Sequence, residues 1–73
     1  MIVFDPFWTL MQKRNISIYA LEYTYNLNPA EISRLKNNHN FTLRSLDRYC
    51  EIFDVQLFEI IEYRKNSYNE EDR

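Results

Sequence analysis

The segment EISRLKNNHN combines side chains that bind anions and base edges with two apolar residues at helical spacing. An arginine guanidinium carries a planar fork of donors that matches a guanine edge or a phosphate, and a lysine ammonium binds phosphate as a point charge. Ser33, Arg34 and Lys36 supply the polar groups, whereas Ile32 and Leu35 supply the apolar pair. The spacing favours a helix that buries the apolar pair and presents the polar side chains on its outer face. An ordinary surface helix with a solvated Arg34 has the same pattern.

Length and composition limit the classes of protein to which the chain can belong. It has 73 residues, 45% of them hydrophobic, which suffices for one small domain but leaves no room for a large active-site cleft. No residues suggest a nucleophile with its base, and no apolar run reaches the ~18 residues that a membrane span needs. The single cysteine, Cys50, excludes an intramolecular disulfide and is expected in the core. We expect a cytoplasmic protein that is not an enzyme and has no metal or other cofactor.

The net charge of −2 hides a division along the chain. Residues 28–48 carry four basic side chains against two acidic ones, whereas residues 49–73 carry seven acidic side chains against three basic ones. The positive segment contains the polar helix face, so a nucleic acid would be attracted there. In this segment Lys36, Arg44 and Arg48 are either phosphate ligands or solvated charges.

Caps and turn residues divide the chain into short helices. Because the chain has no glycine, asparagine must occupy the turn positions with positive φ, and we expect this at Asn15 and Asn26. The expected helices cover residues 6–14, 18–25, 29–37 and 43–53, and LFEIIEY adds one or two further turns. The residues expected to cap the first four helices are Asp5, Ser17, Asn28 and Thr42. The polar stretch NNHN, which includes His39, is expected to form a loop.

Apolar residues at helical steps predict the core. The expected inward residues of the first two helices are Phe7, Leu10, Met11 and Leu21, with either Ala20 or Tyr25. Those of the helix after Thr42 are Leu43, Leu46, Cys50 and Phe53. Trp8 is expected to be partly exposed. Tyr19, Tyr23 and Tyr25 could flank a nucleic acid or pack against the protein, and we expect them to pack.

Near each end of the expected domain, residue types alternate in a way that suggests a short strand. Ile2 and Phe4 flank Val3, and Ile61 and Tyr63 flank Glu62. If the ends meet, residues 2–4 and 61–64 would pair as a small antiparallel ribbon.

The two short helices around Asn26 resemble the helix-turn-helix of small phage-repressor-like regulators of the Cro/XRE type. The resemblance rests on DPFW, ISIYAL, NPAEISRLKNN, FTLRSLDRYC and IIEY, and it covers nearly the whole expected domain. It implies an all-α, five-helix bundle, which we expect over residues 1–65. The acidic composition of residues 66–73 separately predicts a disordered tail. The chain departs from the family at three positions: Asn26 replaces the turn glycine, Glu22 a small residue, and Ile18 a glutamine.

The resemblance also implies a bacterial or phage transcriptional regulator that binds double-stranded DNA as a homodimer. The helix over residues 28–37 would enter the major groove, where Arg34 is the best candidate for a bidentate contact with guanine. The expected DNA-binding residues are Asn28, Pro29, Ala30, Ser33, Arg34, Lys36, Asn37, Asn38 and Arg44. The expected dimer interface, on the fifth helix, is formed by Leu57, Phe58 and Ile61.

An alternative interpretation assigns the same scaffold to a protein partner. The acidic C-terminal third and Glu22 favour a module that binds a repressor, a polymerase subunit or a toxin, since a fold does not fix function. The salt dependence of binding to DNA of mixed sequence would separate the two interpretations.

Overall fold

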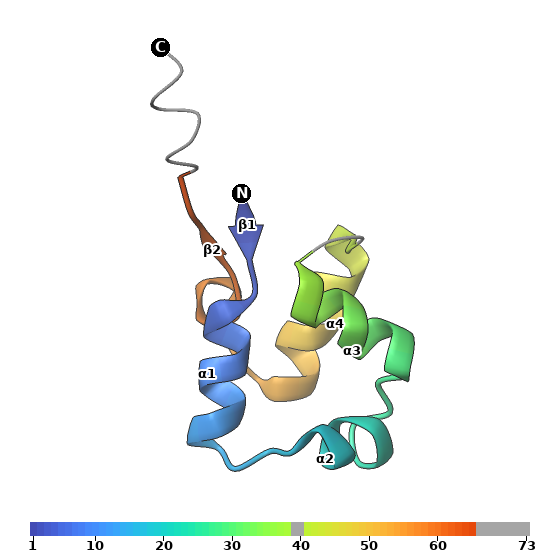
Figure 1. Ribbon diagram of the computed structural model, residues 1–73. Coiled ribbons are helices and arrows are strands. Elements are labelled where there is room, and N and C mark those ends of the chain that lie inside the picture. Colours follow the sequence, from blue (N-terminus) through green and yellow to red (C-terminus); the bar gives the residue numbers. More distant parts are fainter. Residues whose placement is uncertain (39–40, 66–73) are drawn as a thin grey trace.

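The computed structural model describes residues 1–38 and 41–65, so that His39 and the tail over residues 66–73 lie outside the described residues. Figure 1 shows short helices grouped around one core, with the first and last strands side by side at one end. The described elements are β1 (Ile2–Val3), α1 (Asp5–Lys13), α2 (Ile18–Tyr23), α3 (Pro29–Asn37), α4 (Leu43–Phe53), the 3-10 helix η1 (Leu57–Glu59) and β2 (Glu62–Tyr63). The fold is therefore mostly helical, as predicted, although the predicted count of five helices is not confirmed.

Side-chain caps begin three of the four α-helices, as the sequence predicted. Each capping oxygen accepts a hydrogen bond from the backbone N–H three residues later and so satisfies a donor that the helix leaves free. The caps are Ser17, Asn28 and Thr42, which accept from Ala20, Glu31 and Ser45 at 3.1, 2.8 and 3.1 Å.

The predicted cap of the first helix is wrong. Asp5 is the first residue of α1, and Phe4 holds the N-cap position without a side-chain hydrogen bond. The reason is that both residues have distant partners. The backbone N–H of Phe4 donates to Asn38 Oδ1 at 2.7 Å, and an Asp5 carboxylate oxygen lies 3.1 Å from the guanidinium of Arg64.

A residue with positive φ follows the last turn of each of the four α-helices. Asn15 and Asn26 have φ values of 57° and 62°, which confirms both predictions, and Asn38 and Asp54 have φ values of 60° and 56°. At the end of α2, the N–H of Leu27 donates to the carbonyl of Leu21 at 2.9 Å, across the left-handed Asn26. This motif stops α2 at Tyr23, two residues earlier than predicted.

Phe7 lies at the centre of the core and is fully buried. Its ring makes edge-to-face contacts with Trp8 and Phe53, with centroids 5.0 and 5.6 Å apart. On α4, Leu46 and Phe53 are buried as predicted, but Leu43 is 82% exposed and Tyr49 is buried. The inward stripe of α4 is therefore rotated toward Tyr49. Cys50, expected in the core, is partly buried at the edge of this stripe.

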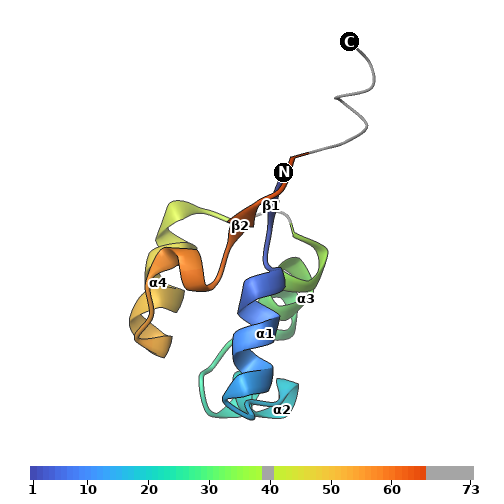
Figure 2. The ribbon, with the colours of Figure 1, turned by 90° about the vertical axis from the view of Figure 1, so that its left-hand side faces the viewer.

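A two-stranded antiparallel ribbon joins the ends of the domain, which confirms the pairing predicted from sequence. Ile2 pairs with Tyr63 and Val3 with Glu62. The terminal amino group of Met1 donates to the Arg64 carbonyl at 2.6 Å, and the Arg64 N–H donates to the Met1 carbonyl at 2.7 Å. Figure 2 shows the ribbon above α1, with α4 to one side.

The ribbon also explains why LFEIIEY does not continue as a helix. Only Leu57–Glu59 forms a helical turn, the 3-10 helix η1, and Glu62–Tyr63 is extended in β2. Ile60, between the two, is fully buried, so the segment is anchored to the core where it changes from helical to extended.

The ribbon predicts a pattern of amide exchange. Because hydrogen-bonded and non-hydrogen-bonded pairs alternate along an antiparallel ladder, the bonded pair at Met1 and Arg64 makes Val3 and Glu62 the next bonded pair. We expect the amide of Val3 to exchange much more slowly than that of Ile2. Exchange measured by NMR checks this, and equal rates at the two positions would contradict the ladder.

Candidate nucleic-acid interface

The buried face of α3 is the one that the sequence predicted. Ile32 and Leu35 are buried in the core, whereas Ser33, Lys36 and Asn37 are exposed. Pro29 and Ala30, in the first turn, are exposed as well. The indole N–H of Trp8 donates to the Leu35 carbonyl at 3.4 Å, which holds α3 against α1. The outer face of α3 is thus available along its whole length.

Arg34 lies on one flank of this outer face and not at its centre. It is partly buried and lines a small cavity of about 10 Å³ toward α4, together with Phe41, Ser45 and Tyr49. Lys36 lies on the opposite flank, at a groove that α1 and Ile18 also line. The two basic side chains therefore border a central strip made by uncharged residues. These are Pro29, Ala30, Ser33 and Asn37.

Three asparagines predicted to contact DNA already have partners within the protein. Asn28 forms a capping box, in which its backbone N–H donates to Glu31 Oε1 at 3.1 Å. Asn37 donates from Nδ2 to the carbonyl and hydroxyl oxygens of Ser33, at 2.9 and 3.4 Å. Asn38 caps the C-terminal end of α3 and accepts from the backbone of Phe4. The hydrogen bonds of these three asparagines therefore define the two ends of α3.

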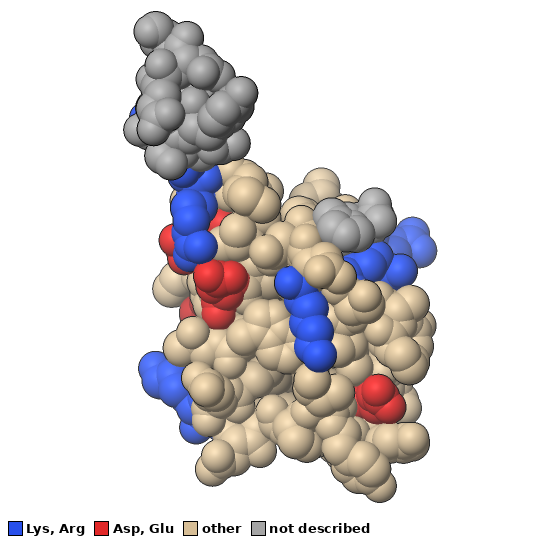
Figure 3. All heavy atoms as spheres, viewed as in Figure 1, with Lys and Arg blue, Asp and Glu red and all other residues tan. Residues whose placement is uncertain are grey.

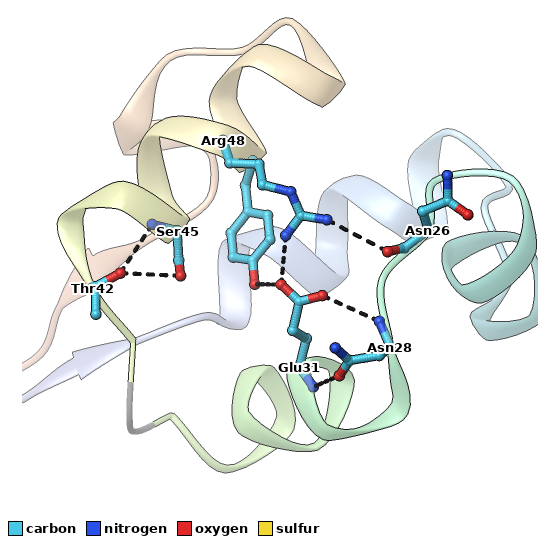
Figure 4. Close-up of polar contacts among 7 residues, drawn as sticks. Asn26, Asn28, Glu31, Thr42, Ser45 and Arg48 are labelled. Atoms are coloured by element: carbon cyan, nitrogen blue, oxygen red, sulfur yellow. Dashed lines mark hydrogen bonds and ion pairs between the residues drawn. The ribbon is translucent and has the colours of Figure 1, made fainter.

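A buried carboxylate connects α3 to α4, and no pattern of residue types indicates this contact. Glu31 is only 8% exposed. Its Oε2 atom accepts from Arg48 Nη1 at 2.5 Å and from the Tyr49 hydroxyl at 3.1 Å. Arg48 also donates from Nη2 to the Asn26 carbonyl at 3.4 Å (Figure 4). Arg48, which could have been a phosphate ligand, is thus part of an internal ion pair.

This network changes the proton affinities of two of its members. Burial would raise the pKa of Glu31, but the backbone N–H of Asn28, the guanidinium of Arg48 and the Tyr49 hydroxyl outweigh it and hold that pKa below its usual value. Burial, followed by the negative charge of Glu31, raises the pKa of Tyr49 to about 12. Glu31 is therefore a carboxylate and Tyr49 a hydrogen-bond donor at neutral pH.

Basic side chains near α3 are few. Within residues 1–38 and 41–65, Arg34, Lys36 and Arg44 take part in no ion pair. Figure 3 shows a face on which uncharged atoms predominate and the Lys and Arg side chains are scattered. The electrostatic attraction for a polyanion would therefore come from a few separate charges bordering α3.

The exposed side of α2 is aromatic. Tyr19 and Tyr23 are 72% and 67% exposed, and their rings lie against each other with centroids 4.6 Å apart. The predicted packing against the protein is therefore wrong for these two. It is confirmed for Tyr25, whose ring packs on Phe53 at 4.8 Å. Glu22, the departure from the expected small residue, is partly buried and lines an open groove beside Tyr23 at the start of α3.

The three residues predicted for a dimer interface differ in exposure. Phe58 is 76% exposed and borders an open groove between α1 and β2, and Leu57 is 42% exposed. Ile61 is partly buried and packs on the core. The first two are therefore available to a partner, whereas Ile61 mainly holds the C-terminal segment in place.

Two features are absent from the described part of the chain. No cluster of three or more His, Cys, Asp or Glu side chains occurs there that could hold a metal ion. None of the helices in that part is long and apolar enough to cross a membrane.

The turn between α2 and α3 yields a prediction about stability. Asn26, at φ 62°, stands in a region that glycine adopts freely and β-branched residues resist. We expect Asn26→Gly to be neutral or slightly stabilising and Asn26→Val to cost about 1 kcal/mol or more. Thermal melts of the two variants measure the difference, and equal stability would contradict the role of this turn.

Comparison with known proteins agrees with this geometry. A family model described as the Cro/C1-type HTH DNA-binding domain matches residues 7–66. No curated protein and no solved structure matches the chain significantly.

Proposed function

The chain belongs to the family of Cro/C1-type helix-turn-helix DNA-binding domains, and we propose that it is a sequence-specific transcriptional regulator that reads the major groove with α3. One observation carries the proposal. Buried residues and capping contacts fix α3 along its length, while its outer face stays free for a partner. A rigid helix with one free face is what direct readout of base edges requires.

The proposed roles of the side chains follow from their positions on α3. Ala30 and Ser33, near the middle of the free face, would contact base edges or a thymine methyl. Arg34, on the flank toward α4, would reach a guanine with its guanidinium fork. Lys36 on the other flank and Arg44 at the start of α4 would contact phosphates and so set the position of α3. The polar ends of α3, at Asn28 and Asn37–Asn38, would lie beside the backbone.

The test of this proposal is selection of bound duplexes from a random pool, followed by titration at two salt concentrations. A regulator of this kind enriches a defined sequence, and its affinity for mixed DNA falls with salt by a slope of about −0.9 for each phosphate contact. Failure to enrich any sequence would contradict sequence-specific readout.

We also propose that the protein acts as a homodimer, since a single small domain with few basic contacts would bind DNA only weakly. Two copies of α3 would then meet half-sites ~34 Å apart. The exposed Phe58 and Leu57 support this proposal, because an aromatic side chain left largely in water is typical of a contact surface.

Phe58→Glu is expected to give a monomer that stays folded, because the side chain is 76% exposed and contributes little to the core. Sedimentation with and without the selected duplex measures the assembly, and a thermal melt checks the fold. A wild-type protein that is monomeric under both conditions would contradict the dimer, as would a variant that unfolds.

A second candidate function, binding of a protein partner, has one specific observation in its favour. The stacked pair of Tyr19 and Tyr23 is exposed, and exposed tyrosines are enriched in protein interfaces. A repressor, a polymerase subunit or a toxin could then be the target. If the protein does not bind DNA of mixed sequence at low salt, binding of a protein partner is favoured over DNA binding.

A further inference from the structure

Arg48 connects three elements around the start of α3. From α4 its guanidinium reaches Glu31 in the first turn of α3 and the carbonyl of Asn26 in the turn after α2 (Figure 4). The same guanidinium lies 5.8 Å from the centre of the Tyr49 ring. Tyr49 donates its hydroxyl to the carboxylate oxygen that Arg48 binds. The sequence separations of 17 and 22 residues mean that these contacts fix tertiary geometry and not a local turn.

We propose that Arg48 is a positioning residue of the DNA interface, which acts through Glu31 and does not itself bind phosphate. This inference rests on the proposed function. Glu31 shares the first turn of α3 with Pro29 and Ala30, and its carboxylate closes the capping box of Asn28. Arg48 therefore sets where the first turn of α3 stands relative to α2 and α4.

The charges explain why Arg48 is suited to this role and not to phosphate binding. Its side chain is 41% exposed, but the guanidinium faces a carboxylate at 2.5 Å, so its positive charge is largely neutralised. Moving it to a phosphate would leave Glu31 buried beside Tyr49 without its ion-pair partner, which is costly. Arg44, one turn earlier on α4, is exposed and has no ion pair within the described residues. The two arginines thus have the same chemistry and different surroundings.

Direct readout depends on placement, since functional groups must be held within about 0.5 Å of their productive geometry. A shift of the first turn of α3 would misalign the groups that face the bases and leave the overall attraction for phosphates unchanged. The quantity that Arg48 controls is therefore the ratio of affinities for a selected and a mixed duplex, not the salt dependence of binding.

The experiment compares Arg48→Met with its matched control Arg44→Met. Both are titrated with a selected duplex and with a duplex of mixed sequence, at several salt concentrations and at a temperature where circular dichroism shows them folded. For Arg48→Met we expect the affinity ratio to fall about tenfold, the order of one lost base contact, with an unchanged salt slope. For Arg44→Met we expect the slope to weaken by about 0.9 and the ratio to stay the same.

Glu31→Gln and the double variant Arg48→Met/Glu31→Gln test whether Arg48 acts through Glu31. Glu31→Gln alone is expected to lower the ratio of affinities for the selected and mixed duplexes without changing the salt slope. If Arg48→Met does not fold, Glu31→Gln tests the proposal in its place. Because both residues belong to one contact, the double variant is expected to lose no more than the stronger single variant. Two independent losses that add would overturn this assignment.

The remaining outcomes separate this inference from the function on which it rests. If Arg48→Met weakens the salt slope and keeps the ratio, Arg48 is a phosphate ligand and the positioning role is overturned. If neither quantity changes, the role is overturned as well. If the wild-type protein binds neither duplex at low salt, the proposed DNA-binding function fails, and the assignment of Arg48 fails with it.

Discussion

Arg34→Ala is expected to weaken binding to the selected duplex by ~1–3 kcal/mol and to relax the preference at one base pair. Arg34 is the basic side chain on α3 that lies on the α4 flank of the free face, and it takes part in no ion pair within the described residues. Its guanidinium is therefore free to form a bidentate contact, which alanine cannot replace. Titration of the selected duplex and of its single-base variants measures the loss.

Lys36→Ala is the matched control for this prediction. It removes one positive charge from the other flank of the same helix and should weaken binding to all duplexes about equally. Because Arg34 is partly buried beside Phe41 and Tyr49, a thermal melt must accompany the titration. If Arg34→Ala also weakens binding to all sequences equally, Arg34 is a phosphate ligand. If neither variant changes binding, α3 does not read DNA, and its free face becomes the first place to look for a protein partner.

Local sequence rules predicted α3 well because most of what defines it lies within ten residues. The cap at Asn28 and the inward pair, Ile32 and Leu35, depend on helix geometry alone. The left-handed residue before α3, Asn26, was predicted because the chain has no glycine to place there. The existence and the free face of the helix could therefore be read from the sequence.

The orientation of α3 could not be predicted in the same way. Its N-terminal turn is held through Glu31 by two residues of α4, Arg48 and Tyr49, which are 17 and 18 positions away. Periodicity places a residue on a helix face but does not give the rotation of that helix in the core. Leu43 and Tyr49 show this, since Leu43 belongs to the predicted inward stripe of α4 and is exposed, whereas Tyr49 lies beside that stripe and is buried.

The C-terminal segment shows the competition between local and tertiary preferences. LFEIIEY has apolar residues at helical steps, but an extended Glu62–Tyr63 can pair with β1, whereas a helix could not. Hydrogen bonds with the first strand therefore determine its conformation, while Leu57–Glu59 keeps a single helical turn. The alternation of residue types at the two ends was the only local sign of this pairing.

Tyr49→Phe is expected to destabilise the domain by ~1.5–3 kcal/mol at pH 7, the usual worth of a hydrogen bond to a charged group. Tyr49 is buried and donates its hydroxyl to Glu31 at 3.1 Å, and phenylalanine keeps the ring while removing the donor. Tyr19→Phe is the control, since that side chain is 72% exposed and its hydroxyl lies in water. Thermal or urea unfolding measures both variants.

The pH dependence of this loss tests whether the Glu31 carboxylate holds the first turn of α3. The folded-state pKa of Glu31 is lowered, so its contribution is present above the ordinary value of 4.5 and is lost as pH falls through the folded value. The cost of Tyr49→Phe should therefore shrink in acid. At the other end of the scale, the pKa of Tyr49 is raised from 10.0 to about 12, so its contribution is present below pH 10.0 and decreases toward pH 12. A cost that stays constant from pH 3 to pH 11 would mean that the Tyr49 hydroxyl has no charged partner, and Arg48 would then be the only residue of α4 that holds the Glu31 carboxylate.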